Sequence, residues 1–83
     1  MEINELVGLN VRRLRQAKGL SQEELYAASG VSQQFISEIE NGSRNPTIET
    51  LAILAQALKA SVADLVTIPD GVKIRVPKRK KKK

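Results

Sequence analysis

Polar side chains with hydrogen-bonding chemistry recur along one side of the segment from residue 32 to residue 41. Gln33, Gln34, Ser37, Glu38 and Asn41 form a single stripe if this segment is helical. Glutamine can pair with adenine in a bidentate fashion, serine can donate or accept, and glutamate can accept from cytosine. Because an α-helix fits the major groove of B-form DNA, the stripe has the chemistry to read base edges.

Residue types that support catalysis or metal binding are scarce. The chain has no histidine and no cysteine, so the usual acid–base group near neutral pH and the usual metal ligands are missing. No P-loop occurs, and no pair of groups is typical of an active site. We therefore expect no enzyme and no bound metal or cofactor.

The 83 residues allow one small domain, and a hydrophobic content of 41% suits an aliphatic core. Uninterrupted apolar runs extend over only a few residues, which argues against a transmembrane helix or a signal peptide. We expect a cytoplasmic protein that does not associate with a membrane.

Charge is divided unevenly along the chain. Residues 1–68 have a balance of −2 and residues 69–83 have a balance of +7, which gives the net charge of +5. We therefore divide the chain into a folded domain over 1–68 and a basic tail over 69–83. The tail favours a polyanionic partner, although terminal lysine runs are often merely solvated. Alternating apolar and basic residues allow a short strand over 72–76.

Helix start and stop signals divide the folded domain into five short helices. Apolar residues at helical spacing indicate a first helix over its N-terminal part. Residues that cap helices mark the four later starts: Ser21, Ser32, Thr47 and Ser61. Glu24 stands three positions after Ser21 and completes a capping box, and Asp64 stands three positions after Ser61, which caps the fifth helix.

The second and third helices are joined through Gly30. Glycine permits a positive φ, so the third helix can leave the second at a steep angle. Apolar residues stand where they would fill the wedge between the two helices: Leu25, Val31, Ile36 and Ile39. This spacing predicts a helix-turn-helix.

Four sequence motifs show a family resemblance: LRQAKGLSQEEL, SGVS, ISEIENG and RNPTIETL. From about Val7 to Leu65 the chain resembles the phage-repressor class of helix-turn-helix domains, which includes lambda repressor, Cro and the Xre family. The resemblance implies an all-α, five-helix bundle that binds double-stranded DNA sequence-specifically. It also implies a homodimer on a two-fold-related operator, and no cofactor.

The resemblance assigns candidate DNA-binding roles by position. Gln22 matches a residue that contacts phosphate and supports a base-reading side chain. The base-facing positions match Gln33, Gln34, Ser37 and Glu38, and the loop that lies on the DNA backbone matches Ser43, Arg44 and Asn45. Taken alone, Gln33 and Gln34 are more typical of a solvated helix face, and Arg44 is also compatible with an ordinary loop charge.

Other residues affect the placement of the helices that carry these candidate DNA-binding residues. Arg15 and Glu40 match a partly buried ion pair that joins the first helix to the end of the third. Two positions depart from the family pattern: Tyr26 stands where the family usually has alanine, and Ser29 stands where a small apolar residue is common. The bulk of Tyr26 bears on the angle between the two helices of the motif.

The sequence thus predicts a transcriptional regulator, specifically a repressor, that places helix 32–41 in the major groove. The alternative is an antitoxin or another protein-interaction module of the same fold, with residues 69–83 as the segment that holds a protein partner. Val72, Ile74 and Val76 would be its apolar anchors.

Overall fold

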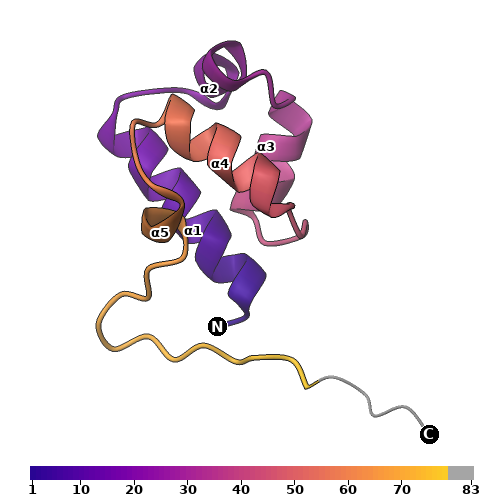
Figure 1. Ribbon diagram of the computed structural model, residues 1–83, viewed down its shortest axis with the longest axis vertical. Helices are drawn as coiled ribbons and strands as arrows, with labels where there is room; N and C mark the ends of the chain where they lie inside the picture. Colours follow the sequence, from indigo (N-terminus) through magenta and orange to yellow (C-terminus); the bar gives the residue numbers. More distant parts are fainter. Residues whose placement is uncertain (79–83) are drawn as a thin grey trace, which may run out of the picture.

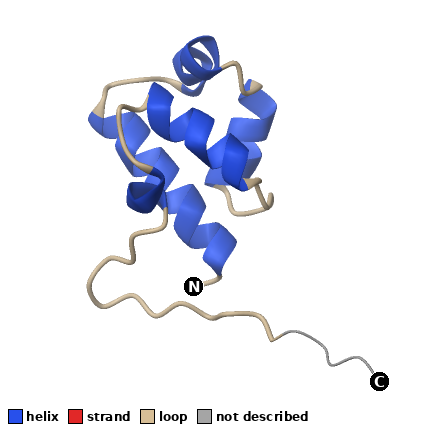
Figure 2. Cartoon of the chain, in the orientation of Figure 1, coloured by secondary structure: helices blue, strands red, loops and turns tan. Residues whose placement is uncertain are grey.

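Five α-helices form the folded part of the computed structural model, which describes residues 1–78 (Figure 1). They are α1 (Ile3–Ala17), α2 (Gln22–Ser29), α3 (Gln33–Glu40), α4 (Ile48–Ala57) and α5 (Val62–Leu65). Loops and turns connect them, and these 78 residues contain no strand (Figure 2). The predicted all-α, five-helix architecture is confirmed. The final part of the lysine run, residues 79–83, lies outside the described residues.

The helix starts agree with the capping residues read from the sequence. The Ser21 hydroxyl accepts from the backbone N–H of Glu24 at 3.0 Å, and the Glu24 carboxylate accepts from the Ser21 N–H at 2.8 Å. Ser61 and Asp64 make the same reciprocal pair at the start of α5. These bonds satisfy backbone donors that the first turn of a helix otherwise leaves unpaired.

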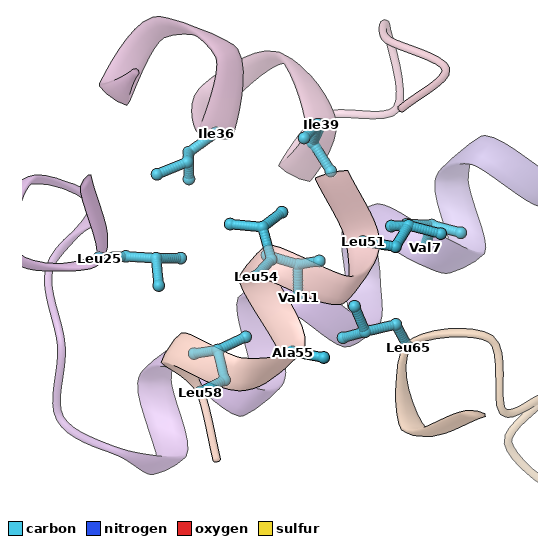
Figure 3. Packing of buried hydrophobic residues seen from close by; sticks show 10 residues of the cluster. All are labelled: Val7, Val11, Leu25, Ile36, Ile39, Leu51, Leu54, Ala55, Leu58 and Leu65. Atoms are coloured by element: carbon cyan, nitrogen blue, oxygen red, sulfur yellow. The ribbon is translucent and has the colours of Figure 1, made fainter. Parts of the chain in front are cut away.

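An aliphatic core lies between the helices, and every helix contributes to it (Figure 3). Leu25 of α2 and Ile36 of α3 point toward Leu54 of α4, and all three are fully buried. The remaining members of the cluster are Val7, Val11, Ile39, Leu51, Ala55, Leu58 and Leu65. The core therefore fixes α2 and α3 relative to each other and to α1 and α4.

Gly8 sits where α1 crosses the C-terminal end of α3. A Cβ atom added at Gly8 would overlap the backbone carbonyl oxygen of Ile39 and lie 2.8 Å from that of Glu40. Only glycine leaves room for the two helix backbones at this distance. The intrinsic cost of a glycine inside a helix, about 1 kcal/mol relative to alanine, is thus linked to the placement of α3.

Asn10 holds the end of α5 against α1. Its side chain is fully buried, and its amide group donates to the carbonyl oxygens of Leu65 at 3.0 Å and Thr67 at 2.9 Å. Buried carbonyl groups without a partner are costly, so these two bonds stabilise the last turn of the domain. No local pattern in the sequence predicts this role of Asn10.

The short strand expected over 72–76 does not form in the described residues. A single parallel bridge joins Arg75 to Glu2, with the Arg75 N–H donating to the Met1 carbonyl oxygen at 2.9 Å. The N-terminal amino group donates to the Lys73 carbonyl oxygen at 3.1 Å. A single bridge is not a ladder. The pairing does not continue beyond Glu2, because α1 begins at Ile3 and its backbone is helical.

None of the described helices is long and apolar enough to cross a membrane.

Candidate nucleic-acid interface

Helix α3 presents its polar side to solvent and its apolar side to the core. Gln33 and Gln34 are exposed, whereas Ile36 and Ile39 are fully buried and point inward (Figure 3). Ser37 and Glu38 are half-buried on the polar side. The Ser32 hydroxyl accepts from the Phe35 N–H at 3.1 Å and so caps the end of the helix that carries the two glutamines.

The corner between α2 and α3 depends on Gly30, which has a φ of 79° and ends α2. Its N–H donates to the Tyr26 carbonyl oxygen at 2.8 Å, and the Ser29 hydroxyl accepts from the Val31 N–H at 3.1 Å. The bend is therefore held by local bonds and by the buried Leu25 beneath it. Tyr26 is 49% exposed, so its bulk lies outside the interface between the two helices.

A buried ion pair joins α1 to the end of α3. The Arg15 guanidinium donates to the Glu40 carboxylate from Nε at 2.6 Å and from Nη2 at 3.0 Å, and to the Leu20 carbonyl oxygen at 2.7 Å. The side chains of Arg15 and Glu40 are 11% and 4% exposed. The hydrogen bond to Glu40 raises the pKa of Arg15, against the opposing effect of burial. The expected ion pair is present.

Gln22 joins the same network. Its side-chain amide donates to Oε1 of Glu40 at 3.0 Å and is half-buried. Within residues 1–78, no hydrogen bond joins Gln22 to Gln33 or Gln34, so the base-facing side chain that it was expected to support is not its partner here. Gln22 instead ties the start of α2 to the end of α3.

The loop that follows α3 folds back on the polar side of that helix. The Ser43 hydroxyl donates to the Glu38 carbonyl oxygen at 3.2 Å, and the Arg44 guanidinium donates to the Glu38 carboxylate at 2.8 Å. The Arg44 guanidinium carbon also lies 4.8 Å from the centre of the Phe35 ring. Asn45 is exposed. The structure thus brings Ser43 and Arg44 to Glu38, a pairing that was not expected from the sequence.

The described part of the tail runs beside the N-terminus of α1 (Figure 1). Val72 and Ile74 are half-buried against the rest of the chain, and Val76 is 77% exposed. Two of the three side chains considered as anchors for a protein partner are therefore partly covered by this chain itself.

Residues 11–65 match the family model described as helix-turn-helix, HTH_3. The chain belongs to this helix-turn-helix family. This agrees with the corner at Gly30, with the buried apolar side of α3 and with the resemblance read from the sequence.

Two relatives match this chain over most of their own length. An uncharacterised HTH-type transcriptional regulator, y4dJ of Sinorhizobium fredii, is 56% identical over 70 residues, which cover 84% of this chain and 91% of that protein. The control protein C.SmaI of Serratia marcescens is 45% identical over 67 residues, covering 81% of this chain and 80% of that one.

One of the solved structures that resemble this chain is a complex with DNA. The restriction-modification controller protein C.Esp1396I was crystallised as a tetramer with its natural 35 base-pair operator. This chain is similar to it with a TM-score of 0.68 and 27% identity, over 78% of this chain and 96% of that one.

Proposed function

We propose that this chain is a DNA-binding transcription regulator that represses by occupying a promoter as a homodimer, with α3 of each protomer in the major groove. The observation that carries the proposal is the outward polar side of α3, which a buried apolar side and a glycine corner hold in a fixed orientation. Membership of the helix-turn-helix family supports it, because the second helix of this motif is the one that enters the major groove.

The position of each candidate residue, on α3 or in the loop after it, indicates whether it contacts bases or the DNA backbone. Gln33 and Gln34 extend from its first turn, which is the end that a recognition helix presents to base edges, and both are exposed. Ser37 follows one turn later. We assign base contact to these three residues and backbone contact to Ser43 and Asn45 in the loop.

Gln22 keeps a role beside the DNA backbone. One N–H of its side-chain amide binds Glu40, which leaves the other available for a phosphate oxygen. The capping box of α2 leaves the backbone N–H groups of Gln22 and Glu23 unused, and the partial positive charge of the helix N-terminus favours such an anion.

Affinity for DNA depends on phosphate neutralisation, yet residues 1–68 have a charge of −2. The basic residues of the tail offset this. The first of them, Lys73 and Arg75, lie beside the N-terminus of α1, where backbone bonds hold the tail. We assign the lysine run a role in non-specific phosphate binding, which adds affinity without sequence information.

Assembly as a homodimer is supported by the C.Esp1396I complex, in which a similar chain forms a tetramer on its operator. Two recognition helices related by a two-fold axis enter successive major grooves about 34 Å apart. The preferred DNA site should therefore be a two-fold-related sequence.

Selection from random duplex DNA, followed by alignment of the bound sequences, tests this function. We expect a two-fold-related motif with half-sites about one helical turn apart. The matched control is the double variant Gln33→Ala, Gln34→Ala, which should fold normally because both side chains are exposed, and should lose the motif. Failure of the natural chain to enrich any sequence, or enrichment identical to that of the control, would contradict the proposal.

A further inference from the structure

Glu38 and Arg44 form an ion pair on the polar side of α3. Nε and Nη2 of Arg44 donate to the same oxygen, Oε1 of Glu38, at 3.1 and 2.8 Å. The side chains are 31% exposed for Glu38 and 51% exposed for Arg44. The pair is therefore accessible to a ligand that approaches this face of the helix.

The Phe35 ring fixes the place of the guanidinium. Phe35 and Glu38 are three residues apart in α3, so their side chains are neighbours on the helix surface. The Arg44 guanidinium carbon lies 4.8 Å from the ring centre, within the range of an attractive cation–π contact. The Ser43 hydroxyl and N–H both bond to the Glu38 carbonyl oxygen, which holds the loop that carries Arg44 against α3.

Hydrogen-bond donors and an acceptor remain available on the ion pair of Glu38 and Arg44. Within residues 1–78, no other hydrogen bond engages the Arg44 guanidinium, and none engages Oε2 of Glu38. An arginine side chain carries several N–H donors in one plane, so some of them stay free beside the ion pair. The pair thus offers a donor fork and one acceptor at a fixed position, next to Gln34 one turn earlier in α3.

The major-groove edge of a G·C pair is the complement of this arrangement. Guanine presents two neighbouring acceptors, N7 and O6, which arginine binds in a bidentate fashion, and cytosine presents the N4 donor, which a glutamate accepts. An A·T pair has its two acceptors separated by the adenine amino group, so it does not match the donor fork.

The ion pair with Arg44 also offsets the repulsion between the Glu38 carboxylate and the DNA phosphates. Glu38 alone would be repelled by the phosphates, and an unrestrained Arg44 would bind phosphates of any sequence. Joined, the two groups are neutral overall and the guanidinium is oriented along the helix surface.

We propose that Glu38 and Arg44 act as one base-reading unit that selects a G·C pair at the edge of the site contacted by α3. Arg44 makes the guanine contact, and Glu38 both positions Arg44 and accepts from cytosine. This proposal rests on the proposed function, since it requires α3 to lie in the major groove.

The test compares the DNA sequences selected by the natural chain with those selected by four variants. Arg44→Ala removes the donor fork, and Arg44→Lys keeps the charge and a donor for guanine but not the planar fork. Glu38→Gln removes the charge that holds the guanidinium, and Arg13→Ala removes one positive charge from an exposed position on α1 as the matched control. A thermal unfolding curve for each variant tests whether the variant is folded.

We expect the natural chain to select G·C at one position of each half-site. Arg44→Ala and Glu38→Gln should lose the preference at that position alone, with affinity for the selected site about tenfold lower. Arg44→Lys should weaken the preference, because an ammonium group can still donate to guanine but lacks the planar fork. Arg13→Ala should retain it.

Three results would overturn the proposal. If Arg44→Ala weakened binding to all sequences equally and left the selected motif unchanged, Arg44 would be a phosphate contact only. Retention of the full G·C preference by Glu38→Gln would exclude the paired geometry as its source. Absence of any selected motif for the natural chain would overturn this proposal together with the proposed function.

Discussion

The side-chain amide of Gln22, the first residue of α2, donates across 3.0 Å to the carboxylate of Glu40, the last residue of α3. The same carboxylate holds the Arg15 guanidinium of α1. One buried acid therefore connects three helices. The orientation of α3, on which the proposed DNA contact depends, is fixed both by the apolar core and by this polar network.

Glu40→Gln should destabilise the domain by about 3 kcal/mol, because it leaves the nearly buried Arg15 guanidinium without a counter-charge. Urea unfolding followed by circular dichroism measures the change. Glu23→Gln, at an exposed position in α2, is the matched control and should shift stability by less than about 0.5 kcal/mol. Equal effects of the two substitutions would show that the network carries little stability.

Gly8→Ala should lower stability by about 1–2 kcal/mol although alanine is the better helix former. The added methyl group would overlap the Ile39 carbonyl oxygen, so α1 must move away from α3. Gln16→Ala, at an exposed position of the same helix, should be nearly neutral. A Gly8→Ala variant with an unchanged or raised melting temperature would rule out this close approach.

Asn10→Asp should destabilise the folded protein by at least about 3 kcal/mol near neutral pH. The Asn10 amide donates to two carbonyl oxygens, and an ionised carboxylate in its place would be repelled by them. Burial beside these carbonyls raises the pKa of the introduced acid, so the loss should diminish as the pH falls and the carboxyl becomes a donor. Unfolding measured at several pH values checks this. Asn4→Asp, in the first turn of α1, should show neither the loss nor its relief in acid.

Gln34→Ala should weaken binding to the selected DNA site by about 1–3 kcal/mol and relax the base preference at one position. The side chain is exposed, so unfolding should be unaffected. Fluorescence anisotropy with duplexes substituted at single positions measures both effects. A loss that is equal for every duplex would instead assign Gln34 to a phosphate.

Removal of residues 77–83 should reduce the dependence of DNA affinity on salt. Each phosphate that the tail neutralises adds about 0.9 to the slope of log K against log salt concentration. Titrations at several salt concentrations compare the shortened and natural chains, and the selected base sequence should be the same for both. An identical slope would remove the tail from the DNA interface.

Local signals made much of the fold predictable. A capping box joins residues three apart, so Ser21 with Glu24 and Ser61 with Asp64 were visible in the sequence and are present in the structure. The Gly30 corner and the buried side of α3 follow from a single glycine and from helical periodicity in the same way. The ion pair of Arg15 with Glu40 was anticipated only through family resemblance.

The alternation of apolar and basic residues over 72–76 led to a wrong prediction, because the expected strand does not form in the described residues. The same pattern suits a strand or an extended tail, and a strand needs a partner of comparable length. In the described residues this segment forms one β-bridge, between Arg75 and Glu2, because α1 begins at the position after Glu2.

By itself, the sequence determined where the helices start and stop and which side of each is apolar, since these depend on neighbours a few residues away. Tertiary structure alone decided that Gly8 admits the backbone of α3, that Asn10 bonds to Leu65 across 55 positions, and that Arg44 turns back to Glu38. Contacts of this kind depend on how the packed helices and loops are placed in space, and no local periodicity encodes that placement.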